Sequence, residues 1–335
     1  MKFKLTLEAN KSATTIHYQD KIMLMGSCFT ENIGAKLHRH LFEVKENPHG
    51  ILFNPMSVIG ALQDYIDNKQ YSDKDLFELN DLFNSWHHHT RFSDITASAT
   101  LTKINNSISD AHTYLKGADK LVITLGSAWL YCLTDVAPSG AGLVVANNHK
   151  APANWFEKKL MDPVELAAQL QKIVTAIQAF NNKIHIIFTI SPVRHLREGL
   201  IENNRSKSVL IYAVHDVIAK LKSVDYFPAY EYVIDDLRDY RFYAEDLVHP
   251  NYAATNYVWD KLVSTYFSED TQLIMGEVAE LQLAKQHKPF NKASIAHQAF
   301  LQKSLLKTQA LQSKYPYLPM TEFITFFSQE LINKV

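Results

Sequence analysis

The sequence predicts an α/β fold in three layers, in which helices cover both faces of a mainly parallel sheet and a helical appendage follows. Four short apolar runs each end at a turn signal, and stretches with helical periodicity lie between them. Alternation of strands and helices is typical of a sheet that is covered on both faces. Of the 335 residues 47% are hydrophobic, so the chain can bury the large core that this fold needs.

The four runs predict buried parallel strands, because each is β-branched or apolar and stops at a turn signal. The strands are expected over residues 21–25, 121–125, 184–190 and 224–227. The turn signals that end them are, in the same order, Gly26, Gly126, Ser191 with Pro192, and Pro228.

Between and after these strands, apolar residues recur at steps of three and four, which predicts helices with one buried face. The helices are expected over residues 30–40, 163–180, 205–221 and 251–267. With the strands, they form the repeated strand-helix order of a doubly covered sheet.

From about residue 271 the composition changes to Leu, Gln, Lys and Ala, which predicts helix through residue 312. A proline-containing break and a last amphipathic stretch follow. We therefore divide the chain into an α/β domain of residues 1–270 and a helical C-terminal appendage of residues 271–335. Amphipathic helices mostly serve packing, so the appendage is interpreted as a packing element and as a candidate surface for a homo-oligomer.

Charge and patterning limit the classes of partner. The formal net charge of -1 gives no general attraction for phosphate backbones or anionic lipids, so neither nucleic acid nor a membrane is expected as a partner. No apolar run approaches the roughly 18 residues of a membrane span. Residues 1–10 lack the apolar segment of an export signal, and two cysteines are too few for a disulfide framework, so a cytoplasmic location is expected.

Parallel sheets of this kind bind ligands outside the carboxyl ends of their strands. This rule singles out the segments that follow the predicted strands. They are Gly26-Ser27-Cys28, Gly126-Ser127-Ala128-Trp129, Ser191-Pro192-Val193-Arg194-His195, and the later stretch Asp246-Leu247-Val248-His249-Pro250.

Ser27 lies directly after a predicted strand and Gly26, and directly before a predicted helix. Its hydroxyl would therefore stand beside the free N–H groups of a helix N-terminus, where negative charge is stabilised. Ser27 is a candidate nucleophile, and the backbone N–H of Ser27 or Cys28 is a candidate donor to the oxyanion. The alternative is a serine that only caps the helix.

Asp246 stands three residues before His249. A carboxylate at this spacing can accept the Nδ1–H of the imidazole, so that Nε2 faces a nucleophile as general base. The alternative is a surface turn that Pro250 closes before the next helix.

Taken together, these features resemble the SGNH hydrolases. More closely, Gly26-Ser27-Cys28-Phe29 is similar to the motif that names the GSCFA family, with Thr30 where the family name has Ala. The resemblance covers roughly residues 1–267. Further blocks that look like this family are Asn47-Pro48-His49-Gly50 with Asn54-Pro55, Trp86 to Phe92, Ser191 to His195, and Tyr226-Phe227-Pro228 with Tyr230-Glu231.

The resemblance implies a flavodoxin-like α/β/α fold and a catalytic triad of Ser27, Asp246 and His249. It also implies backbone help to the oxyanion from Gly50.

One departure concerns the third SGNH block. It usually supplies an asparagine that donates to the oxyanion, whereas this chain has Ala128 in the segment after the strand. Ser127, Trp129 or Asn54 would have to supply that hydrogen bond. Losing one such donor costs on the order of 100- to 1,000-fold in rate.

Several other residues are candidate substrate contacts. Arg194 and His195 follow a strand at the expected site edge, where they could bind an anionic or hydroxyl-rich substrate, or could simply be surface charge. His89, in the run of His87 to His89, is interpreted as pocket wall or as part of a polar loop. No metal is expected there, because the usual zinc spacing is missing. No cofactor is expected either, since the sequence has no phosphate-binding glycine motif.

The expected function is hydrolysis or transfer of an O-acyl ester through a Ser27 acyl-enzyme. A small-molecule or carbohydrate ester is the expected substrate, by analogy with related folds. Two alternatives stay open. One is a non-catalytic binding protein on the same scaffold, and the other is a thiol enzyme that uses Cys28.

Overall fold

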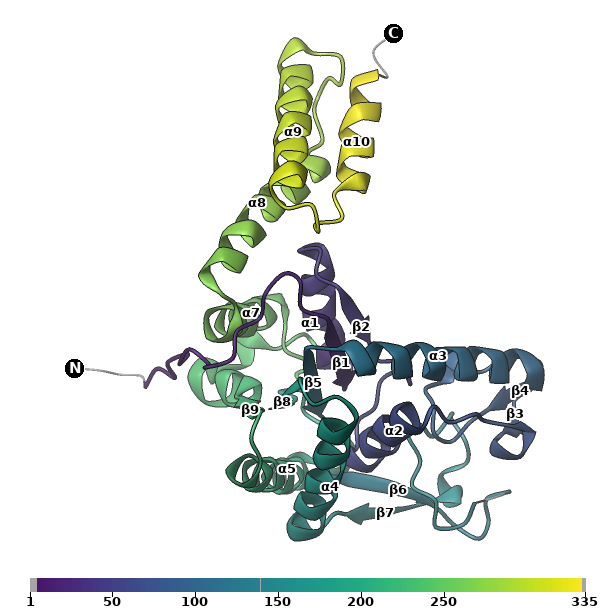
Figure 1. Ribbon diagram of the computed structural model, residues 1–335. Helices are drawn as coiled ribbons and strands as arrows, with labels where there is room; N and C mark the ends of the chain where they lie inside the picture. Colours follow the sequence, from purple (N-terminus) through teal and green to yellow (C-terminus); the bar gives the residue numbers. More distant parts are fainter. Residues whose placement is uncertain (1–4, 139, 333–335) are drawn as a thin grey trace.

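The computed structural model describes residues 5–138 and 140–332. The beginning of the segment considered for export (residues 1–4) and the end of the expected appendage (residues 333–335) lie outside the described residues. Figure 1 shows a central sheet wrapped by helices, from which a group of C-terminal helices projects.

The central sheet has five parallel strands, in the order β2-β1-β5-β8-β9. Counted along the chain within this sheet, that order is 2-1-3-4-5, as in flavodoxin-like folds. The four expected strands are confirmed, with their ends shifted by one residue at most. The strands are β1 (Ile22–Gly26), β2 (Val44–Glu46), β5 (Lys120–Leu125), β8 (His185–Ile190) and β9 (Val224–Phe227).

Helices form a layer on each face of the sheet. Successive residues of β1 alternate between the two layers: Met23 and Met25 join one core cluster, and Ile22 and Leu24 join the other. One face carries α2 (Pro55–Asp67), α3 (Ala97–Gly117), α4 (Pro163–Phe180) and α5 (Leu200–Lys220). The other face carries α1 (Cys28–Arg39) and α7 (Tyr252–Tyr266). The three-layer α/β/α architecture expected from the sequence is confirmed.

Local capping explains where several helices begin. Asp162 accepts hydrogen bonds from the N–H groups of Val164 and Glu165, and Pro163 occupies the first turn of α4. These signals place the start of α4 at the residue expected from the sequence. Helices α2 and α3 were not expected, and neither was the short edge strand β2, whose three residues are all only half-buried.

Two antiparallel hairpins lie beside the sheet, and the sequence patterns did not predict them. They are β3 (Phe77–Leu79) with β4 (Leu82–Asn84), and β6 (Trp129–Leu133) with β7 (Phe156–Leu160). Shorter helical turns are α6 (Ala229–Glu231), a π-turn at Tyr232–Leu237, and 3-10 turns at Asp73–Asp75, Thr90–Phe92, Ala153–Trp155, Leu196–Glu198 and Tyr240–Phe242.

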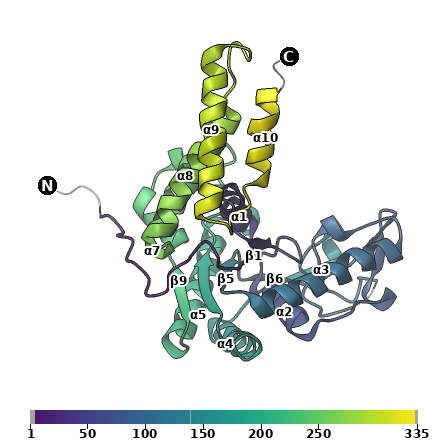
Figure 2. The ribbon, with the colours of Figure 1, turned by 45° about the horizontal axis from the view of Figure 1, so that its top comes forward.

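The C-terminal helices form a projecting arm, seen from two directions in Figures 1 and 2. They are α8 (Glu269–Gln286), α9 (Ile295–Lys314) and α10 (Thr321–Ile332). The helical appendage is confirmed, but a break near Pro289 divides the stretch expected as continuous helix, since proline disfavours helix before it. The arm shares a core cluster with α1 and α7, and Gln282 donates to the carbonyl of Arg39.

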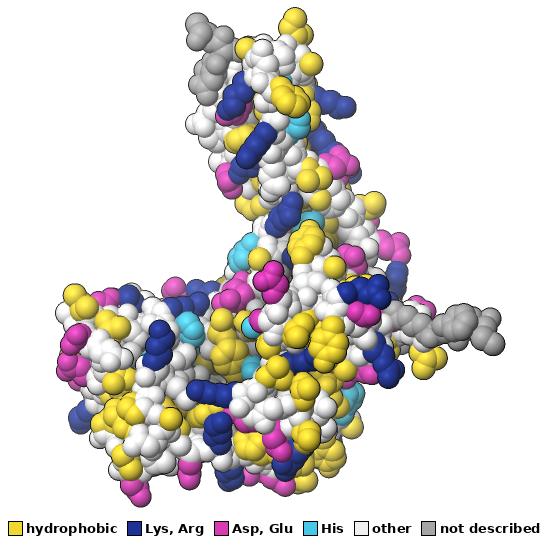
Figure 3. Space-filling view, turned by 180° about the vertical axis from the view of Figure 1, so that it is seen from behind, with side chains coloured by type: hydrophobic (Ala, Val, Ile, Leu, Met, Phe, Trp, Pro, Cys, Tyr) yellow, Lys and Arg dark blue, Asp and Glu magenta, His cyan; other side chains and the backbone are white. Residues whose placement is uncertain are grey.

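Charges of both signs are mixed on the face of the molecule that Figure 3 shows. On the face in Figure 3, Lys and Arg side chains are interspersed with Asp and Glu side chains over both the body and the arm. Within residues 5–138 and 140–332, no helix is long and apolar enough to cross a membrane.

Candidate active site

The strand order reverses between β1 and β5, and the segments after both strands meet at this point. Gly26 ends β1 at a φ of +130°, and a Cβ there would lie 2.0 Å from the Thr124 carbonyl oxygen on β5. Only glycine fits this close approach. Ser27 therefore follows β1 at a point where the backbones of β1 and β5 are in close contact.

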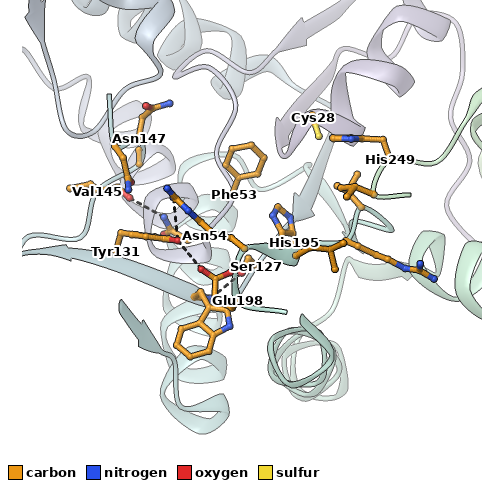
Figure 4. A pocket seen from close by; sticks show the side chains of 18 residues that line it. Cys28, Phe53, Asn54, Ser127, Tyr131, Val145, Asn147, His195, Glu198 and His249 are labelled. Atoms are coloured by element: carbon orange, nitrogen blue, oxygen red, sulfur yellow. Dashed lines mark hydrogen bonds between the residues drawn. The ribbon is translucent and has the colours of Figure 1, made fainter. Parts of the chain in front are cut away.

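A cavity of about 530 Å³ opens at this edge (Figure 4). In this view Cys28 and His249 lie at one end, and Tyr131 and Asn147 lie at the other. Its walls come from the segments that follow β1, β2, β5 and β8, from the β6 hairpin, and from the Asp246 to His249 turn. They are Cys28, Phe53, Asn54, Ser127, Trp129, Tyr131, Val145 to Asn148, Val193 to Glu198, Val248 and His249.

Ser27 occupies the N-cap position of α1, but its hydroxyl makes no capping hydrogen bond. The residue is fully buried, and its Oγ has no hydrogen-bond partner in the described structure. A buried hydroxyl without a partner costs free energy, so capping does not account for a serine here. Cys28, the next residue, lines the cavity, whereas Ser27 does not.

The Asp246 to His249 turn is closed by its own side chains. Asp246 Oδ1 accepts the N–H groups of Val248 at 2.9 Å and His249 at 3.0 Å, and Oδ2 accepts His249 Nδ1 at 2.6 Å. These bonds hold the pKa of Asp246 down at about 2. The imidazole is thus oriented by an ionised carboxylate.

The turn is also tied to the rest of the site. The N–H of Arg194, in the segment after β8, donates to the Val248 carbonyl at 3.1 Å. The His249 side chain is 51% exposed and lines the cavity together with Cys28. Since Ser27 Oγ has no partner, no hydrogen bond joins it to His249 in this structure.

Two of the expected backbone donors are already occupied. The Ser27 N–H donates to the Thr124 carbonyl at 3.2 Å, and the Gly50 N–H donates to the Asn47 carbonyl at 2.7 Å. Gly50 also lies outside the cavity lining. The Cys28 N–H belongs to the first turn of α1, where N–H groups have no acceptor within the helix.

The side chains expected to replace the missing asparagine do line the cavity, but most of their donors are engaged. Ser127 Oγ lies 3.2 Å from Ser206 Oγ and accepts the Trp129 N–H. The Trp129 indole N–H points to the Glu202 carbonyl at 3.4 Å. Asn54 caps α2 and donates from Nδ2 to the Val145 carbonyl at 3.1 Å, which leaves one N–H of its amide.

His195 lines the cavity and has a ring nitrogen that is not engaged. Its Nε2 is buried without a partner, and the ring packs edge-on against Phe53 at 5.5 Å. Burial, with Lys207 and His249 nearby, lowers the pKa of His195 to about 3, so the ring is neutral. Arg194 also lines the cavity, with its guanidinium 4.2 Å from the Tyr243 ring centre.

His89 is not among the residues that line this cavity, so its expected role as pocket wall or substrate contact stays a prediction. Its Nδ1 accepts the Arg91 N–H, and its Cβ packs against Gly50, which leaves no room for a Cβ there. His87 lines a separate cavity next to the buried Asp64. Within the described part of the chain, no cluster of His, Cys, Asp or Glu has the arrangement of a metal site.

Sequence reasoning missed Lys207, Tyr131 and Glu198. Lys207 is a buried cation on α5, and its signal was a lysine at a core position within an apolar stripe that includes Leu210 and Val214. Tyr131 donates to Glu198 at 2.8 Å across the cavity wall. That pair had no sequence signal, because the two residues come from unconnected elements.

Comparison with protein families gives two matches. The model described as GSCFA family matches residues 21–262, which is well over half of the chain. The model described as GSCFA domain protein, C-terminal domain, matches residues 278–333. The first match contains every residue of the cavity, and the second covers most of the arm. A comparison with curated proteins finds no match.

Proposed function

Since the chain belongs to the GSCFA family, we propose that it is a serine hydrolase similar to the SGNH/GDSL hydrolases, which cleaves or transfers an O-acyl ester. Ser27 is the nucleophile, His249 the general base, and Asp246 the group that orients His249. The observation that carries the proposal is the Asp246-His249 pair, in which the carboxylate orients the imidazole at the cavity. Cys28 lines the same cavity, and the residue before it, Ser27, has a buried hydroxyl without a hydrogen-bond partner.

In the first step His249 Nε2 takes the proton of the Ser27 hydroxyl while Oγ bonds to the ester carbonyl carbon. The carbonyl electron pair moves to oxygen. When the carbonyl re-forms, the bond to the alcohol oxygen breaks, and His249 returns its proton to that leaving oxygen. Water or another hydroxyl then attacks the acyl-Ser27 ester by the same route and regenerates the serine.

The mechanism requires that Ser27 Oγ becomes exposed. A side-chain rotation or a small movement of the cavity wall must bring Oγ within about 3 Å of His249 Nε2 and of the substrate. Catalytic hydrogen bonds are often long in structures without substrate and tighten when it binds.

The cavity favours a polar substrate with hydroxyl groups, such as a carbohydrate ester. The aromatic rings of Trp129 and Tyr131 and the amides of Asn147 and Asn148 line the same cavity. Aromatic faces and amide groups together suit a ring that is apolar on its faces and polar at its edge.

The burial of Ser27 also favours one rival, a binding protein that keeps the cavity but does not react. The thiol alternative is less well supported, because burial and, next, the Glu31 carboxylate raise the pKa of Cys28. A thiol with a raised pKa is a poor nucleophile at neutral pH.

Labelling with a fluorophosphonate probe tests the proposal. Wild type, Ser27→Ala and His249→Ala would be compared, with Cys28→Ala as the matched control from the next position. We expect labelling of wild type and Cys28→Ala, and loss of labelling in the other two variants with their fold retained, as checked by circular dichroism. No labelling of folded wild type would support the binding protein, and loss only in Cys28→Ala would support the thiol enzyme.

A further inference from the structure

A buried lysine lies beneath the candidate site. Lys207 reaches from α5 to the carboxyl edge of the sheet and is 1% exposed. Its Nζ donates to the Gly126 carbonyl at 2.6 Å and to the Ser191 carbonyl at 2.7 Å. These residues directly follow β5 and β8, so one ammonium ties together the two loops that form the floor of the site.

The ammonium has no carboxylate partner within the described ranges, since no ion pair joins Nζ to an Asp or Glu within 4.0 Å. The titratable groups that face it are Cys28 from α1, His195 from the segment after β8, and Tyr230 from α6, whose ring centre is 5.8 Å away. A lysine has three N–H donors, and the two carbonyls use two of them.

Burial of a cation without a counter-ion is costly, so a purely structural link between two carbonyls would be better served by a neutral donor. A developing negative charge at the mouth of the site would instead be stabilised by a fixed cation in a medium of low dielectric constant. The segment after β5 lacks the asparagine that could donate to such a charge, because it contains Ala128.

We infer that Lys207 is a positioning residue of the proposed active site, which holds the loops after β5 and β8 in register and supplies the positive potential that stabilises the oxyanion. The inference rests on the proposed function. It assigns the electrostatic role to a residue that lies beneath the loops after β5 and β8 and does not touch the substrate.

The protonation of Lys207 separates this role from a structural one. Burial lowers the pKa of Lys207 to about 7. A neutral amine still has two N–H groups, enough for both carbonyls, so the loops stay tied when the proton leaves. The positive potential is present below pH 7 and is lost as the pH rises through 7. Cys28, with a raised pKa, and His195, with a pKa of about 3, both stay uncharged near this pH.

The rate of fluorophosphonate labelling, measured from pH 6 to pH 9, tests the inference. The variants are Lys207→Gln, which keeps a donor without a charge, and Lys220→Gln, an exposed control on the same helix. We expect the wild-type rate to fall above pH 7. We expect Lys207→Gln to label about 10- to 100-fold more slowly at pH 6.5 and to lose the alkaline fall. Lys220→Gln should behave as wild type.

Equal rates and equal pH profiles in wild type and Lys207→Gln would overturn the inference while leaving the proposed function intact. If Lys207→Gln does not fold, as judged by its thermal melting, Lys207→Arg decides, because a guanidinium keeps its charge over this pH range. A pH profile of Lys207→Arg that matches wild type overturns the inference. Failure of wild type to label at any pH would remove the proposed function, and the role of Lys207 with it.

Discussion

At the Asp246 to His249 turn, the hydrogen bonds of the carboxylate all join residues within three positions of one another, and both side chains are about half exposed. Ser27 is fully buried, and its N–H donates to the Thr124 carbonyl on β5, which is distant in the sequence. The comparison teaches that the base half of the candidate site is built locally, while the nucleophile half depends on the packing of the whole sheet. The following predictions test that difference.

The largest effect is expected for Asp246→Asn. An amide at this position no longer fixes the tautomer of His249, so labelling and any esterase turnover should fall by up to about 10⁴-fold. Because the turn is local and exposed, the melting temperature should change little. A rate within tenfold of wild type would contradict the role of Asp246.

The pH dependence of the same pair sharpens this prediction. The depressed pKa of Asp246 means that its stabilising interaction is present at neutral pH and is lost only as the pH falls through about 2. If wild-type labelling is lost between pH 7 and pH 4, a group other than Asp246 should therefore be responsible. The midpoint pH of that loss should lie well above 2.

Gly26→Ala should destabilise the fold strongly. The added Cβ would collide with the Thr124 carbonyl on β5, in a backbone conformation that disfavours side chains. We expect a loss of roughly 3 kcal/mol or more in the free energy of unfolding, measured by denaturant titration. Gly60→Ala is the matched control: nothing lies within 4 Å of its added Cβ, and alanine in helix α2 should gain about 0.5 to 1 kcal/mol.

Ser27→Ala should leave the fold as stable as wild type or raise its free energy of unfolding by about 1 kcal/mol, because it removes a buried hydroxyl without a partner. Ser191→Ala, by contrast, removes a hydroxyl that accepts the Val193 N–H, and should destabilise the fold. Denaturant titration of both variants checks this pair. A clear loss of stability in Ser27→Ala would show that the hydroxyl has a structural partner.

The smallest effect is expected for Leu247→Gly. Leu247 lies inside the turn at a φ of 57°, where glycine relieves strain but makes the unfolded chain more flexible. These terms oppose each other, so the free energy of unfolding should change by less than about 1 kcal/mol, and labelling should persist. Loss of labelling would mean that the base half is less local than its hydrogen bonds indicate.

Local signals were sufficient for the main strands, for the start of α4 and for the family of the chain. They failed for β2, for the two hairpins and for α2 and α3. The strand β2 is short and half-buried, so its burial pattern carries little information. In the candidate site, Ser27, Asp246 and His249 were predicted from their neighbours along the chain, and their roles stay predictions. The place of His89 outside the cavity lining, beside Gly50, depends on packing that no local pattern records.

The sequence by itself determined the parallel α/β sheet and the Asp246-His249 turn, because both follow from apolar runs, turn residues and hydrogen bonds over a few positions. The tertiary structure alone decided that Ser27 Oγ is buried without a partner, that Gly50 lies outside the cavity lining, and that Lys207 lies beneath the site. The physical reason is that burial and the environment of a charge depend on which distant segments the sheet brings together, and no local pattern records that.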